Sequence, residues 1–470
     1  MQSHAHFDGD DPTWAIAATT PEHSESDASL RSATTDPKNS QDPQPAVFFP
    51  HAPKSFQEAG LRESQVESLV LKFLLNCNTA TGREVAEQIA LPFGMIEPLL
   101  HRLKAEQLVH FKSSAPVGDY VYQLTASGTD RARRFLKQST YFGAAPVALE
   151  DYRRSVETQS PANRRVTLAD VKRAFSDLVL DDRMLAQVGE GINKGVGFFL
   201  YGEPGNGKTC IAERVAKAYD DGVWIARSIS VGGEIVRLFD SIQHEVLPHP
   251  AHNAQDEESK VDRRWVFIRR PTIVAAGELR LDRFEVTTNP ATGIHEAPLQ
   301  LKAACGTLVI DDFGRQAFRP EELLNRLIVP LERRVDYLNM PSGRTFRVPF
   351  EVLTVFSTNL DPLSLVDEAF LRRIPYKVDV DDPSEAQFRE VFLAVANRLG
   401  VECSEEALDY LIQKHYRDAR CPMRFCHPRD LLEQIYNGCQ FREQPLVATH
   451  ENLDVAVQNY LMLQARASNA

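Results

Sequence analysis

Nine residues from Gly202 to Cys210 contain the pattern G-x-x-x-x-G-K-T, directly after the apolar run 198–201. Glycines allow backbone amides to turn inward and cradle an anion at the start of the following helix. We expect Lys208 to reach the β- and γ-phosphates of a nucleotide and the Thr209 hydroxyl to bind Mg²⁺. The predicted phosphate-binding residues are Gly202, Glu203, Pro204, Gly205, Asn206, Gly207, Lys208, Thr209 and Cys210. No Asn-Lys-x-Asp segment that could read guanine lies in a suitable place, so ATP is the expected nucleotide.

Two later strand-like runs end in polar residues that suit phosphoryl transfer. The first, TLVI, is followed by Asp311 and Asp312, and the second, FEVLTVFST, by Asn359. Ligands of open parallel sheets bind at the carboxyl ends of the strands. Asp311 is therefore expected to hold Mg²⁺ through its waters. Asp312 would orient or deprotonate the attacking water, and Asn359 would hydrogen-bond that water or the γ-phosphate.

The composition limits the class of protein. The chain has 470 residues, 43% of them hydrophobic, and a net charge of −12, which indicates two or three domains and argues against a protein that coats nucleic acid. No apolar run approaches the roughly 20 residues of a membrane span. Seven scattered cysteines indicate a reducing, cytoplasmic location. Cys421, Cys426 and His427 lie close together, but their spacing fits no common zinc site, so core thiols are expected.

The first 165 residues divide into three predicted parts. Residues 1–58 are polar and are predicted to be a disordered tail. Residues 59–140 show three helices, two strands and a further helix, an order that resembles a winged helix-turn-helix domain. If this domain binds DNA, His101, Arg102 and Lys104 would face a groove. Its charges are nearly balanced, which argues against a domain that depends on phosphate contacts, and a winged helix used for protein contacts is the other interpretation. Residues 141–165 are predicted to be a linker that docks in part.

The remaining chain is predicted to form an α/β core and a helical lid. Residues 166–380 carry the motifs described above, on strands of a parallel sheet, with a β-rich insertion at about 228–300. Residues 381–466 show four helices with N-capping serines at Ser384 and Ser404.

Taken together, the motifs between about Val166 and Leu463 resemble the AAA+ ATPases. These motifs are the phosphate loop, the strand ending in two acids, the strand ending in Ser-Thr-Asn, DEAFLRRIPYKV and HPRDLL. The resemblance implies that Asn359 is the sensor 1 residue and Arg429 the sensor 2 arginine. It also implies that Arg372 or Arg373 is an arginine finger on a neighbouring subunit. The chain departs from the family at Asp312, where most members have Glu, and in lacking a clear aromatic pore loop.

These observations lead to one main hypothesis of function and two alternatives. The main hypothesis is a Mg²⁺-dependent ATPase that works as a homo-oligomer, a hexameric ring, and remodels a protein or nucleoprotein partner. The first alternative is an ATP-gated DNA-binding regulator that uses the winged helix and hydrolyses ATP slowly or negligibly. The second is a nucleotide-binding interaction protein with negligible hydrolysis, which the shorter side chain of Asp312 leaves open.

Overall fold

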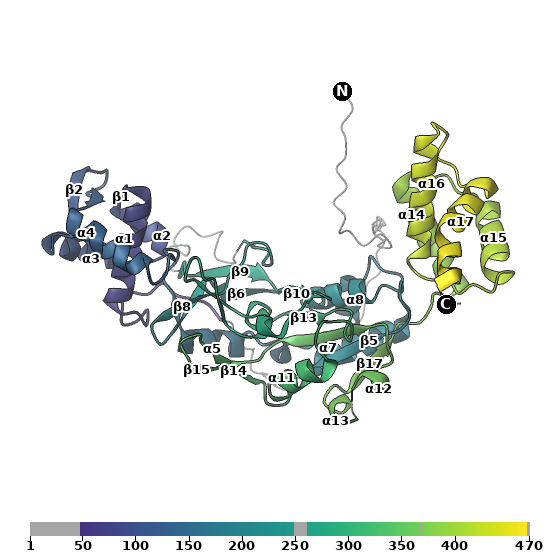
Figure 1. The fold of residues 1–470 in the computed structure, drawn as a ribbon, viewed down its shortest axis with the longest axis horizontal. Coiled ribbons are helices and arrows are strands. Elements are labelled where there is room, and N and C mark those ends of the chain that lie inside the picture. Colours follow the sequence, from purple (N-terminus) through teal and green to yellow (C-terminus); the bar gives the residue numbers. More distant parts are fainter. Residues whose placement is uncertain (1–47, 249–260, 367, 468–470) are drawn as a thin grey trace, which may run out of the picture.

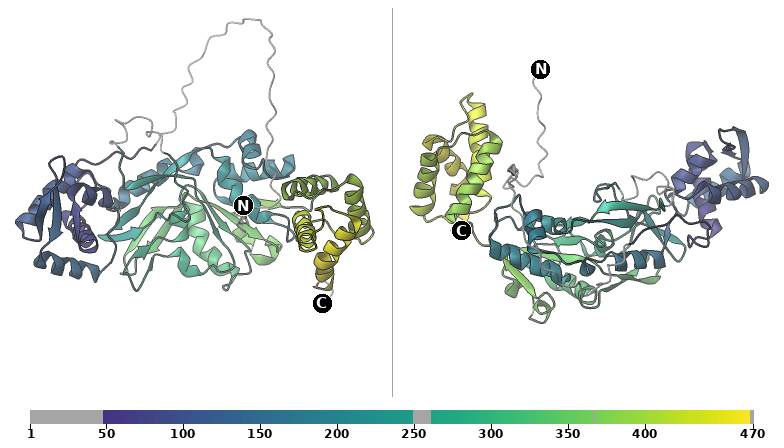
Figure 2. Two further views of the ribbon diagram at one scale, coloured as in Figure 1. Left: turned by 90° about the horizontal axis from the view of Figure 1, so that it is seen from above. Right: turned by 180° about the vertical axis from the view of Figure 1, so that it is seen from behind.

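The computed structural model describes residues 48–248, 261–366 and 368–467. Three parts follow one another along the longest axis, with an N-terminal helical unit at one end, a mixed α/β region in the middle and a helical lid at the other end (Figure 1, Figure 2). Most of the predicted disordered tail, residues 1–47, lies outside the described residues. In the part of the chain that the structure describes, no helix combines the length and apolar character that crossing a bilayer requires.

The N-terminal unit has the elements that the sequence predicts, and one short strand more. Its helices and strands are α1 (Glu63–Cys77), β1 (Thr79–Thr81), α2 (Gly82–Ile89), α3 (Phe93–Ala105), β2 (Val109–Ser114), β3 (Tyr120–Leu124) and α4 (Ala126–Leu136). The additional strand β1 pairs with β3 and completes an antiparallel sheet of order β1-β3-β2. Thr81 caps α2, because its side chain accepts a hydrogen bond from the Glu84 amide.

The middle region contains several small sheets around one apolar core. A five-stranded sheet has the order β11-β12-β8-β7-β4, and two pairs of strands, β6-β9 and β14-β15, lie beside it. The strands are β4 (Val147–Ala148), β6 (Gly222–Ala226), β7 (Ser228–Val231), β8 (Glu234–Arg237), β9 (Trp265–Arg269), β11 (Thr287–Thr288), β12 (His295–Glu296), β14 (Val335–Asn339) and β15 (Thr345–Pro349). The helices α5 (Leu149–Thr158) and α10 (Leu299–Lys302) and the 3-10 helices η1 (Pro161–Asn163) and η4 (Leu281–Phe284) complete this region.

Two predicted boundaries of the N-terminal part need correction. The segment predicted as a linker that docks in part, 141–165, docks as expected through Val147, but it also forms β4 and α5 and buries Tyr152 in the middle core. The end of the predicted tail is also ordered, since the rings of Phe48 and Trp265 have centroids 5.1 Å apart. Both errors have one cause: a few apolar residues in a polar stretch give no periodicity, although tertiary packing buries them.

The N-terminal unit is fixed to the middle region by a buried arginine. Arg264 and Asp262 each have only 4% of the side chain exposed and lie 2.7 Å apart. Arg264 Nη1 also donates hydrogen bonds to the carbonyl oxygens of Ala59 and Pro146, at 3.0 and 3.1 Å. One guanidinium thus joins the two ends of the N-terminal unit to the loop before β9, and its charge is fully compensated.

The main sheet is parallel throughout and has the order β10-β13-β16-β5-β17. Its strands are β5 (Gly197–Tyr201), β10 (Thr272–Ala275), β13 (Thr307–Ile310), β16 (Leu353–Thr358) and β17 (Tyr376–Asp379). The elements around it are α6 (Leu168–Ala174), α7 (Asp182–Lys194), α8 (Lys208–Arg214), the 3-10 helix η2 (Val215–Ala218), α11 (Pro320–Arg333), α12 (Pro362–Leu365) and α13 (Glu368–Leu371). Alternate strand residues enter two apolar layers: Phe198 and Leu200 face one, and Phe199 faces the other.

The predicted insertion at 228–300 is not continuous. Strand β10 falls within that range but pairs with β13 in the main sheet, so the β-rich material lies on both sides of a core strand. The run TIVA has the same β-branched character as the neighbouring insertion strands, and local sequence therefore could not separate it from them.

The C-terminal lid has the four predicted helices. They are α14 (Glu385–Leu399), α15 (Glu405–Leu411), α16 (His427–Phe441) and α17 (His450–Ala467), and a π-helical turn, η5 (Ile412–Arg417), continues α15. Ser384 and Ser404 cap α14 and α15 by accepting hydrogen bonds from backbone amides. The lid stands apart from the sheet and joins it through the segment after β17 (Figure 1).

Candidate nucleotide site

The phosphate loop lies between β5 and α8, as the sequence predicts. Gly205 and Gly207 have φ values of +86° and +79°, which L-amino acids with side chains rarely adopt. At Gly205 a side chain is also excluded by space, since an added Cβ would lie 2.5 Å from the Cys426 sulfur of the lid. The loop can therefore turn its amides inward, and the lid can approach it closely.

Lys208 is the first residue of α8 and is buried. Its Nζ donates hydrogen bonds to the carbonyl oxygens of Gly202 (3.0 Å) and Glu203 (2.9 Å), so the amine is held over the loop. Burial lowers the pKa of Lys208, and the nearby carboxylates of Asp311 and Asp312 oppose that shift. A triphosphate would add negative charge beside this amine and so favour its charged form.

The two oxygen groups expected to bind Mg²⁺ lie next to each other. Thr209 Oγ1 donates a hydrogen bond to Asp311 Oδ2 at 2.7 Å. A hydroxyl and a carboxylate are the hard oxygen ligands that Mg²⁺ takes from proteins, with phosphates and waters completing its shell. The residues therefore fit a magnesium ion, which would neutralise charge on the phosphates.

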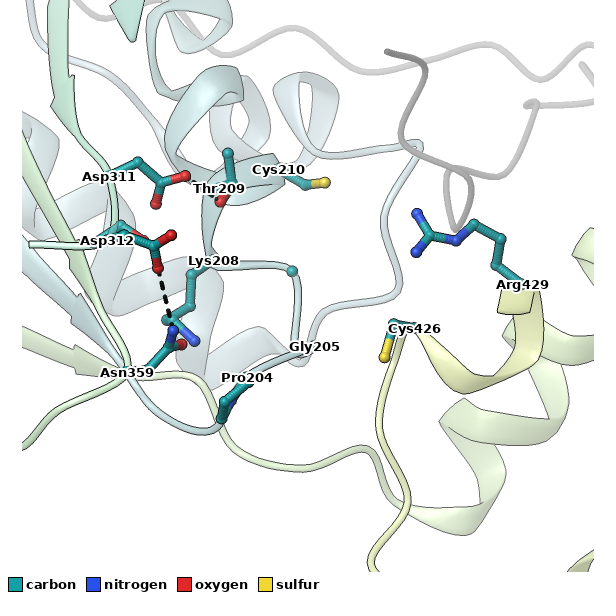
Figure 3. A pocket seen from close by; sticks show the side chains of 12 residues that line it. Pro204, Gly205, Lys208, Thr209, Cys210, Asp311, Asp312, Asn359, Cys426 and Arg429 are labelled. Atoms are coloured by element: carbon teal, nitrogen blue, oxygen red, sulfur yellow. Dashed lines mark hydrogen bonds between the residues drawn. The ribbon is translucent and has the colours of Figure 1, made fainter. Parts of the chain in front are cut away.

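Asp312 and Asn359, which follow the neighbouring strands β13 and β16, are also in contact. Asn359 Nδ2 donates a hydrogen bond to Asp312 Oδ1 at 3.2 Å. Asp312 has a φ of +48°, in the left-handed region that is costly for a residue with a side chain. The carboxylate of Asp312 lines the same pocket as Lys208 (Figure 3), so it can face a water molecule that attacks a bound γ-phosphate.

The lid forms the opposite wall of this pocket. Arg429, in the first turn of α16, extends toward the phosphate loop across an open space (Figure 3). Its Nε donates a hydrogen bond to Asp430 Oδ1 at 2.6 Å. Cys210 and Cys426 line the pocket as well, so Cys426, expected to be a core thiol, is instead a pocket residue.

Arg372 and Arg373 do not line this pocket. They follow α13, which Figure 1 shows below the sheet and apart from the lid. Arg373 Nε forms an ion pair with Glu332 of α11, and Arg372 is exposed. Ten of the predicted site residues line this one pocket, namely Pro204, Gly205, Gly207, Lys208, Thr209, Cys210, Asp311, Asp312, Asn359 and Arg429. Gly202, Glu203 and Asn206 belong to the same loop but do not line the pocket.

Sequence reasoning missed a group of polar side chains that joins the lid to the loop. Arg424 Nη2 donates a hydrogen bond to Glu203 Oε2 at 3.1 Å, and its Nη1 pairs with Asp382. Asn206 Nδ2 donates to Asp382 Oδ1 at 2.7 Å, and the Cys426 amide donates to the Gly205 carbonyl at 2.9 Å. Only the cationic side chain just before a predicted lid helix could have drawn attention to Arg424, and surface arginines commonly occupy such places.

His427 lies at the start of α16, between Cys426 and Arg429. It is buried, and in the described part of the chain its Nε2 has no hydrogen-bond partner, while its Nδ1 lies 3.1 Å from the Tyr416 hydroxyl. Burial lowers the pKa of His427 to about 4, against a smaller opposing effect of Asp430. The lid thus carries a neutral imidazole in its core, next to the pocket.

The three residues predicted to face DNA make contacts within the N-terminal unit. Arg102 lies 3.6 Å from Glu63, 3.7 Å from Glu67 and 3.1 Å from Glu106. Lys104 Nζ lies 3.5 Å from the ring centre of Phe111, and His101 contacts the same ring edge-on. The charge of Arg102 is therefore largely compensated by carboxylates, which reduces its attraction for phosphate.

The lid matches a known sequence family. A family described only as a domain of unknown function (DUF8689) covers residues 384–459, the greater part of the lid. Among curated proteins, no sequence relative was found.

Solved structures show distant similarities. The chain is similar to NtrX from Brucella abortus, with 13% identity over 60% of this chain and 56% of that chain and a TM-score of 0.36. NtrX in complex with ATP matches with 15% identity over 64% of this chain and 62% of that chain, with a TM-score of 0.35. The RuvB Holliday junction branch migration motor of Thermotoga maritima matches with 14% identity over 62% and 69%, with a TM-score of 0.32. The match to NtrX thus spans little more than half of that protein.

The contacts of Arg424 generate a first prediction. Arg424→Ala leaves Glu203 and Asp382 without their cation beside the site of a triphosphate, so the Kd for ATP should rise about tenfold, or ~1.4 kcal/mol. Adding Glu203→Gln should recover part of the loss, because it removes one uncompensated charge. Isothermal titration with ATP measures both effects. Arg420→Ala, which truncates an exposed arginine of the same segment, is the control. An unchanged Kd in Arg424→Ala would exclude this role.

The burial of His427 predicts a pH dependence of stability. The pKa of His427 falls from 6.5 to about 4 on folding, so protons bind the unfolded chain more tightly. The contribution of His427 is complete above pH 6.5 and declines as pH falls toward 4, by up to about 3 kcal/mol. His427→Gln should therefore show a smaller loss of melting temperature than the wild type between pH 6.5 and 4. His110→Gln, on the exposed side of β2, should behave like the wild type.

Proposed function

We propose that this protein is a Mg²⁺-dependent ATPase of the AAA+ type that works as a ring oligomer, a hexamer, and remodels a protein or nucleoprotein partner. One observation carries the proposal: a single pocket brings together Lys208 and Thr209 from the start of α8, Asp311 and Asp312 from the end of β13, Asn359 from the end of β16, and Arg429 from the lid. Each of these side chains has the chemistry that its position in a phosphoryl-transfer site requires.

The proposed roles follow from the contacts. Lys208 and Arg429 place positive charge on two sides of the pocket, where they would bind and polarise the β- and γ-phosphates. Thr209 and Asp311 would hold the magnesium ion, which supplies charge neutralisation when bound. Asp312 would accept a hydrogen bond from the attacking water, while the Asn359 amide fixes that carboxylate without adding charge.

The proposed oligomer rests on the placement of the remaining arginines. Arg372 and Arg373 lie outside the pocket of their own chain, as an arginine that completes a neighbouring site would. An arginine supplied in trans accelerates phosphoryl transfer by roughly a thousand-fold or more. A site shared between subunits would couple hydrolysis to movement of one subunit against the next, which is the basis of the proposed remodelling.

The N-terminal unit is assigned to partner choice. It lies at the opposite end of the molecule from the lid, and Arg264 fixes it to the middle region. The ion pairs of Arg102 favour a protein partner over DNA, because a free guanidinium is what a phosphate contact needs.

Substitutions within the pocket separate binding from chemistry. Lys208→Ala should abolish measurable ATP binding, because the phosphates lose their main point charge. Asp312→Asn should bind ATP within about twofold of the wild type and slow turnover at least tenfold, since only the acceptor for the attacking water is lost. Titration with ATP and steady-state phosphate release measure the two quantities. Normal turnover in Asp312→Asn would remove the role assigned to this residue.

The shared site can be tested by dilution and mixing. Specific ATPase activity of the wild type should rise with protein concentration together with the mass measured by light scattering. Arg372→Ala or Arg373→Ala should lower turnover about a hundred-fold or more while ATP binding persists. Mixing the inactive arginine variant with Asp312→Asn should restore part of the activity, because some interfaces then combine an intact arginine with an intact Asp312. If neither arginine variant changes turnover, the composite site is wrong.

A further inference from the structure

The side chain of Gln316 bridges the turn that carries both acidic residues. Its Nε2 donates hydrogen bonds to the carbonyl oxygens of Asp311 and Asp312, at 2.9 and 3.2 Å. Its Oε1 accepts a hydrogen bond from the Gly314 amide at 2.9 Å. A single amide group therefore uses its donor and its acceptor on three consecutive peptide units of the turn.

The backbone of the turn is also anchored to the strands on both sides, and on the β10 side the Asp311 amide donates to the Ala275 carbonyl at 2.8 Å. Phe313 is fully buried between the rings of Phe199 and Phe356, and its amide donates to the Ser357 carbonyl at 2.8 Å. The Phe313 carbonyl accepts from Thr358 Oγ1 at 2.8 Å. These contacts fix the position of residue 313. The carbonyl oxygen of Asp312 accepts hydrogen bonds from the Gln316 side-chain amide and from the Arg315 backbone amide.

Asp312 needs such support because its backbone is strained. A left-handed conformation costs a residue with a side chain about 1–2 kcal/mol. The carboxylate of Asp is also one methylene shorter than that of Glu, so it has fewer side-chain torsions with which to correct a displaced backbone. The place of the Asp312 carboxylate, 3.2 Å from the Asn359 amide, is thus set mainly by the backbone of the turn.

We infer that Gln316 is a positioning residue for hydrolysis: it holds Asp312 in the left-handed conformation that presents its carboxylate to the attacking water, an inference that rests on the proposed ATPase function. Gln316 does not line the pocket, and its side-chain hydrogen bonds within the described residues go to Asp311, Asp312 and Gly314. It acts on the chemistry through the backbone of Asp312 and leaves nucleotide binding to the loop and the lid.

Two substitutions distinguish positioning from general stability. Gln316→Ala removes all three hydrogen bonds. Gln316→Glu keeps the shape and the acceptor for the Gly314 amide, but replaces the donor by an oxygen that repels the carbonyls of Asp311 and Asp312. We expect both variants to lower kcat at least tenfold and to leave the Kd for ATP within twofold of the wild type. Gln440→Ala, an exposed glutamine of α16, should leave both quantities unchanged.

Amide hydrogen exchange gives a readout that does not depend on turnover. Exchange of the peptide covering residues 311–318 should accelerate in both variants, and more in Gln316→Ala, while the melting temperature stays within a few degrees of the wild type. Wild-type kcat in Gln316→Glu, with the wild-type chain active, would overturn the inference and leave the proposed function intact. A wild-type chain without ATPase activity would overturn both the proposed function and this role. Equal loss of kcat and of ATP affinity would show a merely structural effect and would also overturn it.

Discussion

The parallel register of three neighbouring strands is the constraint on which the site depends. Strand β16 pairs with β5 so that Thr358 lies opposite Tyr201, and with β13 so that Phe356 lies opposite Ile310. In this register β13 and β5 each end within two residues of the end of β16, so the carboxyl ends of the three strands lie at the same edge of the sheet. Strands lie about 4.8 Å apart, so side chains that follow these ends must meet within the width of a triphosphate. A shift by one residue would turn Asp311 and Asn359 to other faces.

Charge balance is the second condition that the site must meet. Asp311 and Asp312 line the proposed nucleotide pocket, Glu203 belongs to the phosphate loop, and Asp382 accepts a hydrogen bond from Asn206 of that loop. The cations that oppose them come from two bodies: Lys208 from the loop, and Arg424 and Arg429 from the lid. Because carboxylates and phosphates repel each other, the cations of the lid contribute compensating charge as well as shape. If the lid turned away, Lys208 would be the one of these three cations left beside the acidic residues.

The sequence could predict those features of the fold and the site that depend on residues close together in the chain. The phosphate loop was predictable because glycines, lysine and threonine act at fixed spacing in one turn. Asp311 and Asn359 were predictable because each follows an apolar strand. Strand β10 was misplaced because its four residues resemble those of the insertion. The left-handed φ of Asp312 and the contacts of Arg424 depend on residues far away in the chain, and no local pattern encodes them.

The contacts of Arg424 and Cys426 connect the lid directly to the phosphate loop. Figure 1 shows the lid helices beyond the sheet at one end of the molecule, whereas the N-terminal unit is fixed at the other end by a buried arginine. The polar contacts of the lid with the phosphate loop are made by Cys426 to Gly205 and by Arg424 to Glu203, and Arg424 also pairs with Asp382 in the segment that leads from β17 into the lid. A ligand moves a domain only through contacts that differ between two states. Because Gly205 and Glu203 belong to the loop that would surround the phosphates, a change in phosphate occupancy would act directly on the contacts that set the angle of the lid.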